Sequence, residues 1–206
     1  PLTAIRGFAE LHRQGAVPEG EKTRELISRI EKESIRMGYL VEDLLMLARL
    51  DQSREMEMKP VNLSKVVNEC VASARAAGPT HPITISAVVD EVFALGDETR
   101  IYQVISNLLT NARVHTPNGT FIEVGLNQSD DGVAISVTDN GNGLTMDDQA
   151  KIFERFFRVD LSRQRNSSEG SGLGLSIVDA VMRAHGGRVS VTSEQGKGAT
   201  FTLFFP

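Results

Sequence analysis

The spacing of apolar residues changes along this chain and divides it into two parts. In residues 1–50 apolar positions recur every three or four residues, which is typical of helices that pack on one face. Residues 51–60 are polar and methionine-rich and show no helical face, so they are expected to form a linker. In residues 61–206 helical spacing alternates with the two-residue period of strands. The pattern therefore predicts an α+β protein with two domains.

The first part is expected to be a helical hairpin. Its first helix ends near Gly15, and its second helix runs from about Lys22 to Leu50. The second helix carries a coiled-coil-like seam of residues spaced three and four apart, namely Ile27, Ile30, Ser34, Met37, Val41, Leu44 and Ala48. Because the first helix can cover only the first half of the second, an exposed apolar stripe and self-association are expected.

The second part is expected to be a two-layer α/β sandwich. Helices are predicted after a cap at Asn62 or Ser64, after a cap at Asp97, and from Gly172 to about His185. The predicted strands are 83–88, 92–95, 121–126, a strand that ends at residue 139, 188–192 and 199–205. This order of elements predicts a mixed sheet with helices on one face.

Composition and charge fit a soluble globular protein. The 206 residues are 24% charged and 40% hydrophobic, and the net charge of -5 does not favour a nucleic-acid or anionic membrane surface. A polyanion would therefore be bound by a local arrangement of backbone amides and basic side chains. The single cysteine, Cys70, is interpreted as a small core residue of a protein from a reducing compartment. No stretch approaches the roughly 20 apolar residues of a membrane span, and no signal peptide is evident.

Candidate chemistry begins with a glycine-rich turn at residues 170–175, where the sequence is Gly-Ser-Gly-Leu-Gly-Leu. The turn leads directly into the apolar-periodic run that predicts a helix, so its backbone amides are unpaired donors at a helix N-terminus. Glycines at such a point let an anion approach the backbone closely. The turn is therefore a candidate site for a phosphate chain.

Asp139 ends a predicted strand and, by the period of two, shares the face of Ile135 and Val137. An inward carboxylate is costly unless a donor meets it, and an adenine amino group would be such a donor. The alternative is that Asp139 merely forms the turn in Asp-Asn-Gly, with Gly141 and Gly143 as ordinary turn glycines.

Two carboxamides complete the candidate site. Asn107 and Asn111 are four residues apart, so they project from one face of the predicted helix, one turn from each other. Together they can hold a hydrated magnesium ion and the phosphates around it. For Asn111 the alternative is a solvated helix residue or a cap.

These blocks resemble the asparagine, glycine and phenylalanine boxes of the two-component sensor histidine kinases. The phenylalanine box corresponds to residues 153–158, a third glycine box corresponds to residues 196–198, and residues 1–8 are similar to the end of the histidine box. The boxes follow the family's order and span essentially the whole chain. The resemblance implies an ATP-binding domain of the gyrase, histidine kinase and MutL type at residues 61–206. It also implies that residues 1–50 are a remnant of the dimerisation and phosphotransfer domain.

The resemblance also implies roles for individual residues. It implies Mg-ATP as the ligand, with Asn111 at the metal and with Asn107 and Arg158 in catalytic roles. The residues that it places around the nucleotide are Asn107, Asn111, His115, Asp139, Gly141, Gly143, Leu144, Gly170, Gly172, Leu173, Gly174 and Leu175.

Several of these assignments keep alternatives. Arg158 either reaches the phosphates or only solvates the segment between the glycine turns. The phenylalanines of residues 153–157 are interpreted as hydrophobic anchors rather than base-stacking groups. Val114 stands where the family commonly has a lysine, and the adjacent Arg113 is a candidate replacement. His115 matches an aromatic position near the adenine or ribose, where a packing role is expected.

The reaction implied by the resemblance is transfer of the γ-phosphoryl group of ATP to a histidine nitrogen and then to an aspartate of a response-regulator protein. The accepting histidine is expected before residue 1, because His12 does not lie in the family's motif. The chain by itself is therefore not expected to autophosphorylate. The family also implies a homodimer through the hairpin and a cytoplasmic kinase domain in a membrane-anchored parent.

Two other functions are alternatives, and the first of them, ATP hydrolysis, is disfavoured. ATP hydrolysis, as in gyrase- or MutL-type relatives, uses a glutamate base where this chain has Asn107, and a carboxamide cannot take a proton from water. The other alternative is a nucleotide-dependent interaction module without chemistry.

Overall fold

The computed structural model describes residues 2–15, 20–51, 56–86, 91–159 and 172–206. The chain divides into two compact units, Pro1–Met46 and Leu47–Pro206. The first unit contains the helical hairpin that the sequence predicts, and the second contains the predicted α/β sandwich.

The first unit is built from α1 (Leu2–Arg13) and from α2 (Glu21–Asp51) as far as Met46, and both helices are close to the predicted ones. No residue of α1 is buried. On α2, Ile30 and Met37 are half-buried, whereas Ile27, Val41 and Leu44 of the predicted seam are exposed. The expected exposed apolar stripe is therefore present.

The second unit contains a five-stranded sheet in the order β2-β4-β5-β7-β6. Its strands are β2 (Ile83–Ile85), β4 (Ile122–Ser129), β5 (Gly132–Asp139), β6 (Arg188–Glu194) and β7 (Gly198–Phe205). Strand β2 runs parallel to β4 and the other neighbours are antiparallel, so the sheet is mixed as predicted. Strand β2 is shorter than predicted, and residues 87–90 of the prediction lie outside the described residues.

A separate two-stranded sheet pairs β1 (Lys59–Asn62) with β3 (Phe93–Gly96). Strand β1 includes Lys59 and Pro60, which the sequence pattern assigned to the linker and for which it predicted no strand. Its polar residues and its proline hid the strand, because proline cannot donate a ladder hydrogen bond. The antiparallel partner β3 supplies the pairing that local composition does not indicate.

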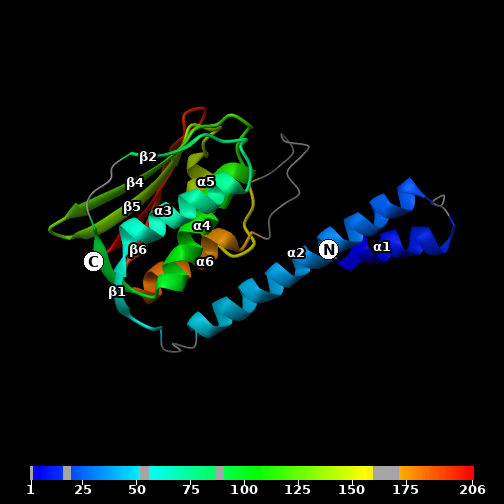
Figure 1. The fold of residues 1–206 in the computed structure, drawn as a ribbon, viewed down its shortest axis with the longest axis horizontal. Coiled ribbons are helices and arrows are strands. Elements are labelled where there is room, and N and C mark those ends of the chain that lie inside the picture. The colour runs from blue at the N-terminus through cyan, green and yellow to red at the C-terminus, as the bar shows by residue number, and fades with distance from the viewer. Residues whose placement is uncertain (1, 16–19, 52–55, 87–90, 160–171) are drawn as a thin grey trace. The chain divides into compact units, whose positions relative to one another are not determined.

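Helices α3 (Leu63–Ala76), α4 (Glu98–Val114) and α6 (Gly174–Ala184) lie on one face of the five-stranded sheet (Figure 1). The caps agree with the predictions, since Asn62 accepts from the N–H of Lys65 and Asp97 accepts from the N–H of Arg100. The core between helices and sheet includes Val66, Cys70, Ile101, Ile105, Leu108, Val124, Ile135, Val137, Ile177, Val181 and Leu203. The core role predicted for Cys70 is confirmed.

Helix α5 (Met146–Lys151) was not predicted. It is short and has no buried residue, so the sequence carries no apolar period that would indicate it. Thr145 caps it by accepting from the N–H of Asp148. The helix follows directly after the first glycine turn.

Candidate functional site

The two carboxamides of α4 face the start of α6. Asn107 Nδ2 donates to the carbonyl of Gly174 over 3.4 Å. Asn111 Oδ1 lies 4.0 Å from the position that a Cβ on Gly174 would occupy. Both asparagines are half-buried. The structure thus brings the predicted asparagine pair to the predicted phosphate turn, although 67 residues separate Asn107 from Gly174.

The start of α6 is shaped for close approach to its backbone. The helix begins after Leu173, which is fully buried and provides no side-chain cap hydrogen bond. Gly174 and Leu175, in the first turn of the helix, are both half-buried. The first amides of a helix carry partial positive charge and favour an anion. Gly170, which the sequence also assigns to this turn, lies outside the described residues.

Gly172 joins this turn to the phenylalanine box. Its φ is +73°, and a Cβ on it would lie 3.0 Å from the backbone of Phe156. The carbonyl of Gly172 accepts from the N–H of Phe156 at 2.9 Å. Phe156 itself has a φ of +65°, which is unusual for a bulky residue. The contact with Gly172 therefore accompanies a backbone conformation of Phe156 that a bulky residue rarely adopts, whereas glycine adopts its own conformation readily.

The phenylalanine box is anchored on the sheet by Phe153. Its ring packs edge-on against that of Phe201, with centroids 6.4 Å apart. This contact favours the predicted anchoring role for Phe153. Phe156 is 59% exposed and makes no ring contact among the described residues.

Asp139 is buried on the face of β5 that the alternation predicts. Only 7% of the residue is exposed, and Oδ1 accepts from the N–H of Gly141 at 2.9 Å. Burial raises the pKa of Asp139, while hydrogen bonds from the N–H groups of Gly141 and Ala199 oppose that rise. It forms no ion pair with a cation of the described residues. A buried carboxyl group that has backbone hydrogen bonds but no ion pair can accept a further hydrogen bond from an uncharged donor.

The first glycine turn is packed against two neighbours. A Cβ on Gly141 would lie 2.6 Å from Thr116 Cγ2, and one on Gly143 would collide with the carbonyl of Glu194. The turn carrying the third glycine box is tied to it, because Gly196 donates to the carbonyl of Asn142 at 2.7 Å. Side-chain atoms thus crowd the position of a Cβ at Gly141, whereas backbone atoms and a φ of +65° exclude one at Gly143.

Leu144 is half-buried, and its N–H donates to Ser193 Oγ at 2.8 Å. Ser193 in turn donates to the carbonyl of Gly198 at 2.7 Å. Sequence reasoning missed Ser193, which is one of several alternating polar residues on β6 and carries no distinguishing signal. It holds the first and third glycine turns together.

His115 and Arg158 lie near each other at the C-terminal end of α4. His115 is the C-cap of this helix and is exposed to solvent, yet surrounding protein atoms lower its pKa by desolvation, with a smaller contribution from the charge of Arg158. Arg158 of the phenylalanine box therefore lies near the C-terminal end of α4, the helix that carries Asn107 and Asn111.

Arg113 points elsewhere. Its Nη2 lies 3.1 Å from the position of a Cβ on Gly78, at the end of α3, and its Nε is buried without a hydrogen-bond partner in the described part of the chain. This is the α3 side of α4 and not the side that faces Gly174. The structure gives no support to the idea that Arg113 replaces the missing lysine.

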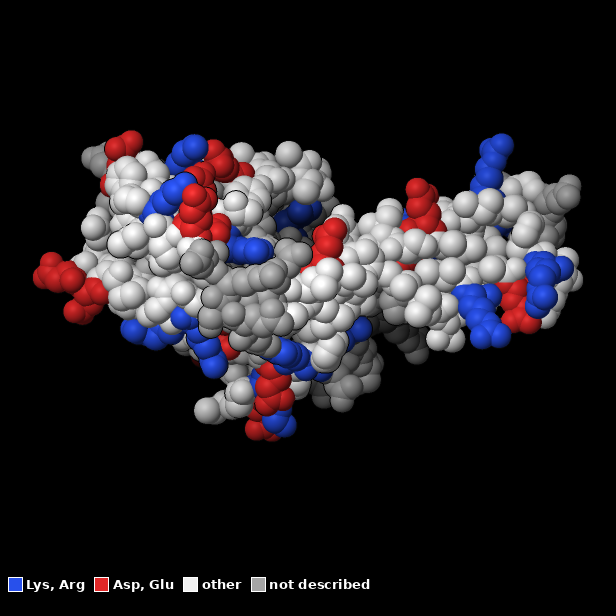
Figure 2. Space-filling view, turned by 90° about the horizontal axis from the view of Figure 1, so that it is seen from below, with Lys and Arg blue, Asp and Glu red and all other residues white. Residues whose placement is uncertain are grey.

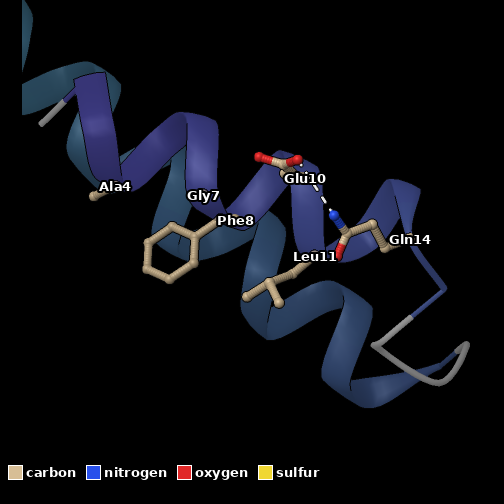
Figure 3. A pocket seen from close by; sticks show the side chains of 6 residues that line it. All are labelled: Ala4, Gly7, Phe8, Glu10, Leu11 and Gln14. Atoms are coloured by element: carbon tan, nitrogen blue, oxygen red, sulfur yellow. Dashed lines mark hydrogen bonds between the residues drawn. The ribbon is translucent and has the colours of Figure 1, made fainter.

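In the other unit of the chain, a hollow of about 410 Å³ lies along α1 of the hairpin (Figure 3). It is lined by Ala4, Gly7, Phe8, Glu10, Leu11 and Gln14. Phe8 and Leu11 contribute apolar surface, and Gln14 donates to Glu10 at 3.2 Å. With one carboxylate and no cation in its wall, the hollow does not suit a phosphate.

Charge at the surface is mixed. On the face shown in Figure 2, acidic and basic side chains are interspersed without a large field of one sign. No cluster of three metal-binding His, Cys, Asp or Glu side chains occurs within the described residues. In the part of the chain that the structure describes, no helix has the length and the apolar composition that a membrane span needs.

Comparisons with known proteins agree with this geometry. Residues 96–206 match the histidine kinase-, DNA gyrase B- and HSP90-like ATPases, and residues 1–53 match the His Kinase A phospho-acceptor domain. The probable sensor histidine kinase TcrY of Mycobacterium tuberculosis is 44% identical over 197 residues, which cover 95% of this chain and 41% of TcrY.

Solved structures show the same fold. The mycobacterial sensor histidine kinase MprB matches with a TM-score of 0.62 and 29% identity, over 72% of this chain and 97% of that chain. Full-length ShkA in complex with AMPPNP matches with a TM-score of 0.72 and 30% identity, over 100% of this chain and 43% of that chain. The chain belongs to the histidine kinase-, DNA gyrase B- and HSP90-like ATPase family and, within it, to the two-component sensor histidine kinases.

Proposed function

We propose that this chain is the ATP-binding core of a protein-histidine kinase and that it binds Mg-ATP between α4, the end of β5 and the start of α6. The observation that carries the proposal is the approach of Asn107 and Asn111 to Gly174. Oxygen ligands for a metal and helix-terminal amides for phosphates are thereby available in one place.

At the other end of the nucleotide, Asp139 would accept a hydrogen bond from the adenine amino group. Its burial and the absence of an ion pair within the described residues support this role, because a purine amino group is an uncharged donor. Gly141 and Gly143 would allow the backbone to approach the base. His115, the C-cap of α4, would pack near the adenine or ribose.

The donor set fits magnesium that arrives with the nucleotide. Asn111 offers a hard amide oxygen, and no carboxylate cage exists within the described residues. Mg²⁺ usually binds through one or two protein oxygens together with substrate phosphates and water. When bound there, the ion would neutralise phosphate charge. Asn107 donates a hydrogen bond to the carbonyl of Gly174. This bond would hold α4, and with it Asn111, in position for the ion.

The reaction would be transfer of the γ-phosphoryl group from ATP to a histidine nitrogen, breaking the bond to the β-phosphate oxygen and releasing ADP. Such transfer depends mainly on positioning and on charge neutralisation. Arg158, whose charge acts on His115, would contribute positive charge near the phosphates. Gly172, Leu173, Gly174 and Leu175 would supply the backbone cradle.

The chain spans 41% of the length of TcrY, so properties of a whole protein are proposals here. The phosphoryl group would pass to an aspartate of a response-regulator receiver domain. Dimerisation through the hairpin is supported by its match to the phospho-acceptor domain and by its exposed apolar residues. The similarity to sensor kinases supports the further proposal that the parent protein is membrane-anchored, with this part in the cytoplasm.

Nucleotide binding is tested by thermal unfolding of the chain with ADP or ATP, with and without Mg²⁺. Ligand at 100 times its Kd should add about 2.7 kcal/mol to the free energy of unfolding. Asn111→Ala should remove the part of this shift that depends on Mg²⁺ and leave the rest. Absence of any shift at millimolar nucleotide would refute the proposed site.

Phosphoryl transfer is tested with γ-labelled ATP and an N-terminally extended chain that contains the expected histidine. Acid-labile, base-stable label on the extended chain supports the kinase. Release of inorganic phosphate without labelled protein would favour ATP hydrolysis, and binding without either product would favour the interaction module.

A further inference from the structure

A buried histidine outside the predicted boxes is linked to the adenine end of the site. His81 lies between α3 and β2 and is only 5% exposed. Both ring nitrogens face threonine hydroxyls, with Nδ1 3.0 Å from Thr80 Oγ1 and Nε2 3.1 Å from Thr116 Oγ1. Thr116 directly follows the C-cap of α4, 35 residues away.

The direction of the second hydrogen bond follows from the partners of Thr116. Its hydroxyl donates to the carbonyl of Ala112 at 2.6 Å. A hydroxyl has one hydrogen, so toward His81 it accepts, and Nε2 of His81 carries the proton. Two hydrogen bonds with different directions then hold Thr116 in one rotamer.

That rotamer sets the wall of the first glycine turn. Thr116 Cγ2 lies 2.6 Å, and its Cβ 3.0 Å, from the position that a Cβ on Gly141 would take. Gly141 in turn donates its N–H to Asp139 Oδ1 at 2.9 Å. A different rotamer of Thr116 would change the surface on which Gly141 rests and would shift the N–H that orients the carboxylate.

The backbone around His81 reinforces this link. The carbonyl of Thr80 accepts from Gly119 at 2.7 Å, and the carbonyl of Pro82 accepts from Ile122 at 2.9 Å. Residues 80–82 are therefore tied to the segment that follows α4. Within this tied segment, the side chain of His81 makes the hydrogen bond to Thr116.

We infer that His81 is a positioning residue for purine recognition, acting through Thr116 on Gly141 and Asp139. The inference rests on the proposed function, because it gives Asp139 the role of adenine acceptor. His81 touches neither the nucleotide nor the reacting atoms. Its effect should fall on ADP affinity and on the local environment of Gly141.

The test uses the 206-residue chain and two substitutions of the same residue. His81→Phe keeps a ring but removes both nitrogens, and His81→Gln keeps an N–H that can reach Thr116. Calorimetric titration with Mg-ADP, well below the unfolding temperature of each variant, should show affinity about tenfold weaker for His81→Phe, the size of one displaced hydrogen bond. His81→Gln should recover most of that loss.

Amide NMR supplies a readout that a general loss of stability would not produce. The Gly141 N–H signal of the nucleotide-free protein should move in His81→Phe and return towards its original position in His81→Gln. Cys70→Ala, a core substitution between α3 and α4, serves as the matched control and should leave Gly141 and the ADP affinity unchanged.

A double-mutant cycle with Asp139→Asn separates this inference from the proposed function. If His81 acts through Asp139, His81→Phe should cost little further affinity in the Asp139→Asn background. An equal loss in both backgrounds, or an unmoved Gly141 signal, would overturn the inference while leaving the nucleotide site intact. Failure of the unsubstituted chain to bind ADP would instead overturn the proposed function. Should His81→Phe not fold, Thr116→Val removes the hydroxyl and keeps the shape, with the same expected outcomes.

Discussion

Two buried titratable side chains, Asp139 and His185, are expected to make the properties of the protein depend on pH. Asp139 is an acid whose pKa burial raises, and His185 is a base whose pKa burial lowers. In both cases burial makes the charged form less favourable than it is in water. The two residues nevertheless have different expected consequences, one for ligand binding and one for stability.

Asp139→Asn should weaken ADP binding by about tenfold or more, because an amide oxygen replaces a charged acceptor of the adenine amino group. The free energy of unfolding at neutral pH should stay equal or rise, since a desolvated charge is removed and Gly141 can still donate to the amide oxygen. Calorimetric titration and chemical unfolding measure the two effects. Unchanged ADP affinity would remove Asp139 from the site.

ADP affinity should also depend on pH through Asp139. Because its pKa in the fold is raised above 3.8, protonation occurs at a higher pH than for an ordinary aspartate. A protonated carboxyl accepts poorly, so affinity should fall as the pH is lowered through that raised value. The Asp139→Asn variant is the control, and its affinity should lack this part of the pH dependence.

His185 joins the ends of two helices. Its Nε2 accepts from the N–H of Asp97 at 3.0 Å, and its Nδ1 donates to the carbonyl of Val181 at 2.8 Å. The first contact requires an unprotonated Nε2. Burial lowers the pKa of His185, opposed by the hydrogen bond to Val181 and by the charge of Asp97.

The stability of the fold should therefore decrease in acid. The unfolded chain gains a proton on His185 near pH 6.5 while the folded chain resists it, so the contribution is complete above 6.5 and is lost as the pH falls towards the lowered folded pKa. Urea unfolding from pH 8 to pH 5 measures this loss. His185→Gln should show a flatter profile, and identical profiles would contradict the assignment.

At the scale of elements, the phosphate turn depends on a glycine whose conformation and surroundings both exclude a side chain. Gly172 combines a positive φ with backbone atoms of Phe156 at 3.0 Å from any Cβ. Gly196 has a similar φ of +84° but open space around it. Substitution of Gly196 tests the cost of the positive φ alone, whereas substitution of Gly172 tests the positive φ together with crowding by Phe156.

Gly196→Ala should lower the free energy of unfolding by about 1–2 kcal/mol, the usual cost of a left-handed conformation for alanine. Gly172→Ala should cost more, because the phenylalanine box must also shift. It should weaken ATP binding as well. Equal stability losses for the two variants would show that the contact with Phe156 carries no weight.

At the scale of the whole molecule, the hairpin leaves apolar side chains in water. Ile27 is 57% exposed and Val41 53% exposed, and both belong to the seam that the sequence predicts. A stripe of this kind is normally covered by a partner. A second copy of the hairpin would bury both stripes together.

The chain should therefore self-associate, with a molar mass by light scattering that rises with concentration. Val41→Glu together with Leu44→Glu should shift it to the monomer, because each puts a charge into the seam. Ser28→Glu, at an exposed polar position, is the control and should not. A monomer at every concentration would contradict the expected interface.

The sequence predicted some elements of the fold better than others. The inward face of Asp139, the caps Asn62 and Asp97, and the mixed sheet agree with the predictions. Helix α5 and strand β1 were missed, because a short surface helix and a strand containing Pro60 carry little apolar period. The possible role of Arg113 was open in the sequence, since spacing alone does not say which neighbour an arginine meets.

What the sequence determined by itself was local: the periods of helices and strands, the helix caps, the glycine turns, and the order of boxes that identifies the family. These follow from interactions within a few residues along the chain. Only the tertiary structure decided that Asn107 meets Gly174 and that His81 meets Thr116, since the members of these pairs are 67 and 35 residues apart. Such contacts arise when the helices pack on one face of the sheet, and no local pattern specifies their geometry.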